Sequence, residues 1–208
     1  GSDLCISHNS DDEATYFKCT PDSKGFNQLH LNALYDLQTR TYIDAIIQPA
    51  RQENEPKAMC DMIDRYSGNR KTIFIADRGY ENYNIFAHAH EHGLFYLIRV
   101  KDLLSNGIVS SFKNQLPKEQ KSFDKSVSIT LTRKQTNEVK DNPKKYRIIM
   151  KVTPFDYLDL HINKFYDLQM RIVRFPISEN TYESIITNLP AEEFSAEDIK
   201  ELYYMRWG

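Results

Sequence analysis

The segment from Lys71 to Tyr80 holds the aspartate whose position has the clearest chemical meaning in this chain. An apolar run from Ile73 to Ala76 predicts a short strand covered on both faces, and Asp77 follows where that strand should end. Ligands collect beyond the carboxyl ends of parallel strands, so a carboxylate there can reach a metal ion or a substrate. From position alone, an equally good interpretation is that Asp77 caps the helix that follows.

Tyr203 and Arg206, near the end of the chain, are two further candidates. Ser195, with acidic residues directly after it, predicts the start of a helix. Residues three apart share one face of a helix with about 3.6 residues per turn, so the two side chains should lie together. Without the rest of the sequence, the simpler interpretation is an amphipathic helix with a partly buried arginine.

Three cationic side chains, Arg78, Arg99 and Lys101, lie at or near the ends of predicted strands, on the side expected for Asp77. They suit contacts to phosphates, which position nucleic acid without reading its sequence. Binding through such contacts should weaken steeply with salt concentration. Each residue alone is more often an ordinary surface charge, so the interpretation depends on their arrangement.

The order of the predicted elements places these residues on a mixed α/β sheet with helices packed on it. Residues 28–37 alternate between apolar and polar, with Leu29 on one face and His30 on the other, and predict a half-buried strand. Residues 41–47 should pair with it as an antiparallel hairpin. Helices and strands then alternate at 55–66, 72–76, 81–92 and 94–101.

The chain changes character after residue 104, where most of the predicted elements are strands. These are expected at 126–132, 146–152, 168–173 and 182–187. Residues 104–175 hold 14 Lys and Arg against 7 Asp and Glu, and the rest of the chain holds 13 against 22. A basic segment beside an acidic one suggests a module that faces a polyanion, joined to one that is rich in carboxylates and suited to metal binding. A solvated surface rich in lysine is the simpler alternative.

Several classes of protein are excluded by composition. No apolar run approaches the roughly 20 residues of a membrane helix, and the first residues lack a secretory pattern. The three cysteines contain no Cys-x-x-Cys pair, so a disulfide framework or zinc ribbon is not expected. The sequence therefore predicts a soluble intracellular protein.

The candidate residues belong to motifs that occur in a fixed order. These are Ala76-Asp77-Arg78-Gly79-Tyr80, Phe86, Gly93-x-x-Tyr96-x-x-Arg99-x-Lys101 and Leu202-Tyr203-x-x-Arg206-Trp207. In this order they resemble the DDE transposases of bacterial insertion sequences, most closely the branch with the signature Tyr-x-x-Arg-x-x-x-Glu-x-x-x-x-x-x-Lys. Segments 29–36 and 188–189 extend the resemblance over nearly the whole chain. Each motif alone is weak, but the ordered combination is specific.

The resemblance implies an RNase H-like catalytic core formed by residues 1–103 and 181–208, with 104–180 as a β-rich insertion before the last helix. It also implies two aspartates and one glutamate that hold two Mg²⁺ or Mn²⁺ ions. Two such ions, about 4 Å apart, stabilise both the attacking and the leaving oxygen of an in-line displacement at phosphorus. Asp77 matches the second aspartate, and is expected to be catalytic and a metal ligand.

The resemblance gives roles to the other candidates. Arg206 would hold the glutamate or contact a phosphate, and Tyr203 would form a hydrogen bond to DNA or to its terminal hydroxyl. The first aspartate is expected directly before Gly1, and the glutamate two residues beyond Gly208, so a fragment truncated at both ends and inactive as given is expected. If Gly1 and Ser2 are instead a cloning remnant, Asp3 becomes a candidate.

The implied activity is cut-and-paste transposition, in which a freed 3′ hydroxyl of the element is joined to target DNA. Double-stranded DNA is then the partner, a homodimer would hold two element ends together, and the location would be the bacterial cytoplasm, at the nucleoid. Two alternatives stay open: an RNase H-like nuclease that cuts without joining, and a non-catalytic DNA-binding protein descended from a transposase.

Overall fold

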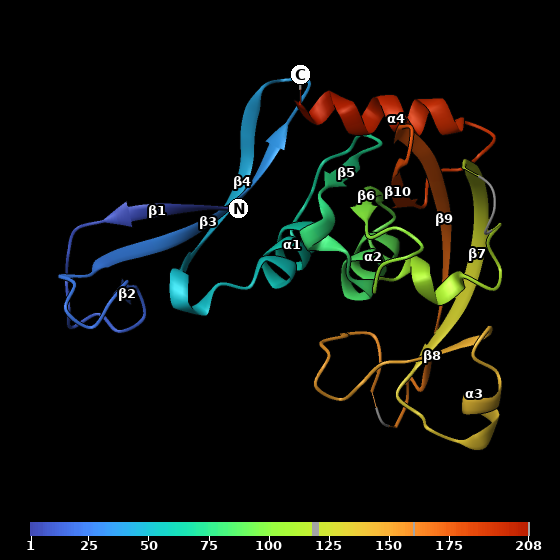
Figure 1. Ribbon diagram of the computed structural model, residues 1–208, viewed down its shortest axis with the longest axis horizontal. Helices are drawn as coiled ribbons and strands as arrows, with labels where there is room; N and C mark the ends of the chain where they lie inside the picture. The colour runs from blue at the N-terminus through green and yellow to red at the C-terminus, as the bar shows by residue number, and fades with distance from the viewer. Residues whose placement is uncertain (118–120, 160, 208) are drawn as a thin grey trace. The chain divides into compact units, whose positions relative to one another are not determined.

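The chain divides into two compact units, Gly1–Ser67 and Gly68–Gly208 (Figure 1). A computed structural model describes residues 1–117, 121–159 and 161–207. Gly208, the last residue of the predicted returning segment, and four residues of the predicted insertion therefore lie outside the described part. None of the described helices is both long enough and apolar enough to cross a membrane.

The first unit contains an antiparallel sheet of four strands. Its strands are β1 (Ser2–Ile6), β2 (Tyr16–Phe17), β3 (Phe26–Asp36) and β4 (Thr41–Pro49). The long strand β3 pairs with each of the other three, and its pairing with β4 confirms the predicted hairpin. A 3₁₀ turn (Ala50–Gln52) leads to helix α1 (Glu55–Asp64), where the side chain of Asn54 accepts the N–H of Lys57 at 3.0 Å.

The more deeply buried face of β3 is its polar one. His30 is 7% exposed and Asn32 is 1% exposed, whereas Leu29 and Leu31 are only partly buried. The alternation therefore predicts the strand correctly, but the apolar face is not the more buried of the two. His30 tolerates burial because both of its ring nitrogens face carboxylates, and the Nδ2 of Asn32 donates to the side chain of Gln48 at 3.2 Å.

The second unit is built on a mixed sheet of six strands. In spatial order these are β5 (Ile73–Ala76), β6 (Phe95–Val100), β10 (Thr181–Thr187), β9 (Phe165–Ser178), β7 (Phe123–Thr132) and β8 (Tyr146–Ile148). The pairs β5–β6 and β7–β8 are parallel and the others antiparallel. With α-helices in both units, the chain has a mixed α/β fold consistent with an RNase H-like architecture, as predicted.

Two details of the sheets differ from the predicted arrangement. The hairpin β3–β4 and the strands β5 and β6 belong to separate sheets, although the order of elements suggests one. The strand predicted at 146–152 ends at Ile148 because its partner β7 ends at Thr132, the residue paired with Ile148. The strand β10 pairs with β6 on one side and with β9 on the other, so the strands of the predicted insertion continue the sheet of β5 and β6.

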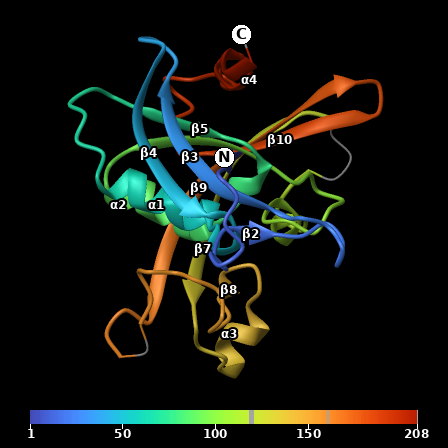
Figure 2. The same ribbon diagram turned by 90° about the vertical axis from the view of Figure 1, so that its left-hand side faces the viewer.

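Helices cover both faces of this sheet. Helix α2 (Tyr83–Glu91) stacks Phe86 on Tyr96 of β6, with ring centroids 4.9 Å apart. The next residue of β6, Leu97, points to the other face and joins a buried apolar cluster with Ile199 and Tyr203 of helix α4 (Ala196–Tyr204). Figure 2 shows α4 and the short helix α3 (Asn137–Asp141) at opposite ends of the second unit.

The local signals for α4 operate as predicted. Ser195 and Asp198 form a capping box, in which the Ser195 side chain accepts the N–H of Asp198 and the Asp198 carboxylate accepts the N–H of Ser195. A 3₁₀ turn (Met205–Trp207) follows the helix directly. This turn brings Arg206 back toward the end of β5, where the candidate site lies.

Candidate functional site around Asp77

Asp77 lies directly after β5 and uses part of its carboxylate to cap a short turn. Its Oδ1 accepts the N–H of Arg78 at 2.7 Å, at the start of the 3₁₀ turn Arg78–Tyr80. The following helix, α2, has its own cap in Asn82, so the predicted alternative of a cap on that helix does not apply. The Asp77 side chain remains 41% exposed, and the capping interaction leaves it available for other chemistry.

Two arginines distant in sequence converge on the Asp77 carboxylate. Arg206 Nη2 donates to Oδ2 at 3.2 Å, and Arg99 Nη1 lies 3.7 Å from Oδ1. Partial burial alone would raise the pKa of Asp77, but the hydrogen bonds from Arg78 N–H and Arg206, with the charges of both arginines, bring that pKa below its usual value. Asp77 is therefore a carboxylate held in its charged form and fixed in orientation.

A second carboxylate, that of Glu183, lies behind Arg99. Arg99 Nε is 3.1 Å from Glu183 Oε1, an ion pair whose geometry falls short of a hydrogen bond, and the Glu183 side chain is only 7% exposed. The hydroxyl of Tyr204 donates to its other oxygen at 3.4 Å. Because Ile185 pairs with Arg99 across β10 and β6, Glu183 is the diagonal neighbour of Arg99 on the same face.

Glu183 is not among the site residues predicted from the sequence. The sequence carries a usable signal, because a glutamate in the same strand as Ile185 and Ile186 needs a cationic partner if that strand is buried. The sequence does not say which cation that is, since the antiparallel pairing of β6 with β10 joins residues 84 to 90 positions apart. This pairing is what makes Glu183 part of the site.

Tyr203 supports the site from within the core. It is 1% exposed, and its hydroxyl accepts a hydrogen bond from Arg206 Nη2 at 3.5 Å. Burial raises the pKa of Tyr203, so the hydroxyl stays protonated. The predicted proximity of Tyr203 and Arg206 is confirmed, and the contact holds the guanidinium that faces Asp77.

Arg78 and Lys101 are exposed residues at the same edge of the sheet. The parallel strands β5 and β6 run to the same edge, where the last residue of β5, Ala76, pairs with Ile98 and β6 continues to Val100. The two cations follow the ends of these strands. The backbone N–H of Lys101 donates to Glu81 Oε2 at 2.8 Å, which fixes the start of the loop after β6. The two cationic side chains therefore flank the strand ends near Asp77.

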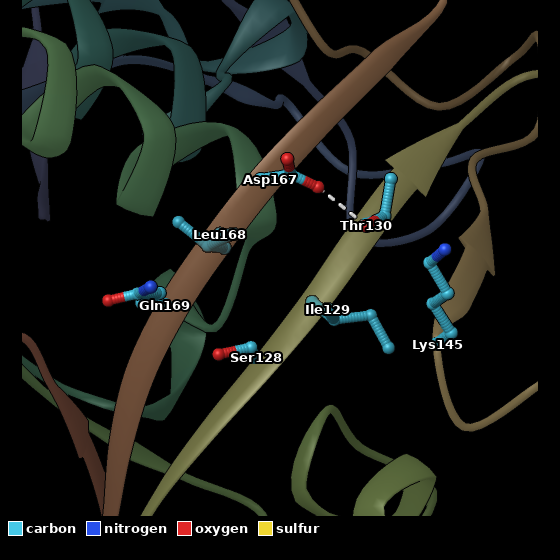
Figure 3. Close-up of a pocket in the computed structure, with 7 residues that line it drawn as sticks. All are labelled: Ser128, Ile129, Thr130, Lys145, Asp167, Leu168 and Gln169. Atoms are coloured by element: carbon cyan, nitrogen blue, oxygen red, sulfur yellow. Dashed lines mark hydrogen bonds between the residues drawn. The ribbon is translucent and has the colours of Figure 1, made fainter.

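A pocket of about 300 Å³ lies elsewhere, beside the strands β7 and β9 (Figure 3). In the pocket lining, the hydroxyl of Thr130 of β7 donates a hydrogen bond to Asp167 of β9, and Lys145 is a further lining residue. None of the predicted site residues lines this pocket. The candidate site around Asp77 is therefore separate from this pocket.

The chain that carries these residues matches a known protein family. Residues 7–208 match the family described as the transposase DDE domain. The chain belongs to the transposase DDE domain family. No curated protein matches the chain. Transposase DDE domains are enzymes that act on DNA and generally depend on divalent metal ions, which agrees with the resemblance found in the sequence.

Among the described residues around this site, Asp77 is the one carboxylate that fits a metal ligand of a transposase DDE domain. The Asp77 carboxylate is ionised and partly exposed, and Mg²⁺ is commonly held by one or two carboxylates together with water and substrate phosphate. Glu183 is separated from Asp77 by Arg99, which contacts both acids. Asp77 therefore fits as a single oxygen ligand, and Glu183 serves to hold Arg99.

Proposed function

We propose that this chain is the catalytic domain of an insertion-sequence transposase, which cleaves the phosphodiester bonds at the ends of its element and joins the freed 3′ hydroxyl to target DNA. The observation that carries the proposal is the contact between Asp77 and Arg206, two motif residues 129 positions apart in sequence. A helix cap alone requires no such contact, whereas an acid that must be charged and oriented gains both properties from it.

In this proposal Asp77 is a catalytic metal ligand, and the neighbouring residues prepare it. Mg²⁺ or Mn²⁺ ions, when bound, stabilise the charge on the attacking and leaving oxygens. Arg206 and Arg99 keep Asp77 ionised, Tyr203 holds Arg206, and Glu183 holds Arg99. Such preorganised charges lower the barrier because they need little rearrangement during the reaction.

The exposed cations near the strand ends bind the DNA backbone in this proposal. Arg78 and Lys101 make phosphate contacts. Arg99 makes a further one, on the side of its guanidinium that faces Asp77. Each neutralised phosphate releases counterions, so affinity should fall with salt concentration. A homodimer would hold two element ends together, and the enzyme would work on DNA in the bacterial cytoplasm, at the nucleoid.

The family pattern that the sequence resembles places the other two carboxylates next to the ends of the chain, an aspartate before Gly1 and a glutamate beyond Gly208. In this proposal, residues 1–208 alone do not cleave DNA, because they hold only one of the three carboxylates that the family pattern implies. The activity should therefore be measured on the product of the complete reading frame that contains these residues.

The test is cleavage and joining of DNA that carries the element ends, with Mg²⁺, by that protein and its Asp77→Asn variant. Loss of a residue that merely supports a metal ligand costs 10- to 100-fold, so loss of a ligand should lower the cleavage rate by about 100-fold or more. Asp22→Asn, at an exposed loop position, is the matched control and should keep full activity.

The other possible results of this assay would each support a different function. Undiminished cleavage by Asp77→Asn would show that Asp77 is not the catalytic acid. Cleavage without joining would identify a nuclease, and binding to DNA without cleavage by the intact protein would identify a non-catalytic descendant.

A further inference from the structure

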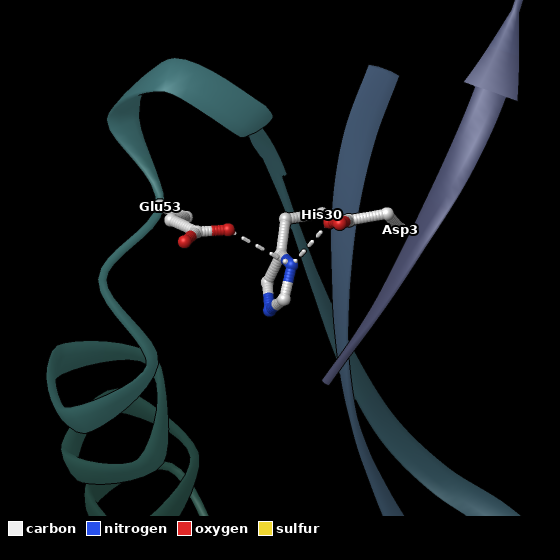
Figure 4. A group of neighbouring side chains, drawn as sticks. All are labelled: Asp3, His30 and Glu53. Atoms are coloured by element: carbon white, nitrogen blue, oxygen red, sulfur yellow. Dashed lines mark hydrogen bonds and ion pairs between the residues drawn. The ribbon is translucent and has the colours of Figure 1, made fainter. Parts of the chain in front are cut away.

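A second group of potential metal ligands lies in the first unit, on residues that the proposed function does not use (Figure 4). It consists of Asp3 on β1, His30 on β3 and Glu53 just before α1. Asp3 and His30 are direct partners in the antiparallel register of β1 and β3. The sheet and the turn before α1 therefore bring the three side chains together.

Both carboxylates face the same nitrogen of the imidazole. His30 Nδ1 is 2.8 Å from Asp3 Oδ1 and 3.1 Å from Glu53 Oε2, and the three potential ligand atoms lie within 4.8 Å of one another. A single proton on Nδ1 can form a good hydrogen bond with only one of the two oxygens. A metal ion bound to Nδ1 can coordinate both.

The other nitrogen of His30 is already engaged. Nε2 lies 3.1 Å from Glu55 Oε1, and Gly1 packs so closely against it that a side chain at position 1 would overlap with the ring. Histidines that bind metal through one nitrogen commonly donate the N–H of the other to a carboxylate, which fixes the tautomer and the ring orientation. Glu55 is placed to accept that hydrogen bond.

We propose that Asp3, His30 and Glu53 form a binding site for one divalent transition-metal ion, Zn²⁺ by the chemistry of its ligands, with Glu55 as the outer carboxylate that orients His30. The site is independent of the transposase activity assigned to Asp77. An imidazole together with carboxylates favours Zn²⁺ over Mg²⁺, because Mg²⁺ takes oxygen ligands almost exclusively.

The geometry is close to that of a Zn²⁺ site. Ligand atoms of tetrahedral zinc lie roughly 3.4 Å apart, given bonds of about 2.1 Å. The separations of 2.8 and 3.1 Å therefore need to open by about 0.6 and 0.3 Å, and the two carboxylate oxygens already lie within 4.8 Å of each other. The Asp3 and Glu53 side chains, 49% and 51% exposed, can make this adjustment, and they leave room for water as the fourth ligand.

The charges of the group favour a cation. Three carboxylates, of Asp3, Glu53 and Glu55, surround one imidazole whose side chain is 9% exposed. Even a protonated imidazole carries one positive charge against their three negative charges. A divalent ion at Nδ1 compensates two of the three, while Glu55 accepts the hydrogen bond from the other ring nitrogen of His30.

The test is calorimetric titration of residues 1–208 with Zn²⁺, in a background in which Cys5 and Cys19, both exposed thiols, are replaced by serine. We expect one ion per chain, and a loss of affinity of at least 10-fold in His30→Gln and in Asp3→Asn. Glu55→Gln should weaken binding by about 10- to 100-fold. Asp77→Asn and His8→Gln are matched controls that should bind as the parent does.

Folding of each variant is checked by circular dichroism. Glu53→Gln keeps the test decisive if the buried His30 cannot be replaced without unfolding, because Glu53 is half exposed and contributes little packing. The proposal is overturned if the parent binds no Zn²⁺, or if Glu53→Gln and Asp3→Asn bind it as tightly as the parent. It is also overturned if Asp77→Asn abolishes binding, which would place the ion at the proposed catalytic acid.

Discussion

Replacing Glu183 with glutamine should destabilise the second unit by about 2 kcal/mol. Glu183 and Arg99 lie 3.1 Å apart, with side chains 7% and 26% exposed. Removing one partner of a fully buried ion pair costs about 3–5 kcal/mol, because the other charge is left uncompensated. The cost is smaller here, since Arg99 is partly solvated and keeps Asp77 at 3.7 Å as a second partner. Glutamine preserves the shape and can still accept the Tyr204 hydrogen bond.

The measurement is urea unfolding of residues 1–208, monitored by tryptophan fluorescence and circular dichroism. The matched control is Glu193→Gln, because Glu193 pairs with Lys71 at 3.3 Å while both side chains are more than half exposed. Such a surface pair contributes about 0–1 kcal/mol. If Glu183→Gln unfolds at the same urea concentration as Glu193→Gln, the buried pair does not stabilise this unit and our account of how Arg99 is held is wrong.

Three further predictions concern charged groups of the second unit. Arg206→Gln should raise the pKa of Asp77, because it removes one of the hydrogen bonds and one of the two charges that lower this pKa; NMR titration of the carboxyl group measures it. Asp102→Asn should cost about 3 kcal/mol in urea unfolding at neutral pH, because Arg174, 8% exposed, loses its two-point ion pair. Burial would raise the pKa of Asp102, but the hydrogen bonds from Arg174 and Ser184 bring it below its usual value. The stability difference should therefore be complete at neutral pH and disappear as the pH falls through the lowered pKa. Lys101→Ala should weaken DNA binding by the intact protein and reduce the slope of log affinity against log salt by about 0.9, whereas an unchanged slope would exclude a phosphate contact.

The elements that the sequence predicts well are those fixed by local chemistry. Asn54 and Ser195 mark the starts of α1 and α4, because a side-chain oxygen at that position satisfies free N–H groups of the first turn. The apolar runs of β5 and β6 likewise predict their strands. These signals lie within a few residues of the structure that they determine.

What the sequence does not predict depends on contacts between distant segments. The burial of His30 depends on the carboxylates of β1 and of the turn before α1, which only the folded unit brings to β3. The role of Glu183 depends on the pairing of β10 with β6. Periodicity reports which residues share a face of a strand, but not which face is covered or by what.

Capping and the proposed catalytic role can share the Asp77 carboxylate, although the cap is on the short turn that begins at Arg78 and not on helix α2. Oδ1 accepts the N–H of Arg78 and so caps a turn, while Oδ2 accepts from Arg206. The capping bond fixes the carboxylate at the strand end and lowers its pKa, which is what the proposed role as a metal ligand requires. A local preference for aspartate at such a turn therefore could not separate the two roles. The separation comes from Arg206, since a residue 129 positions away has no part in capping the turn.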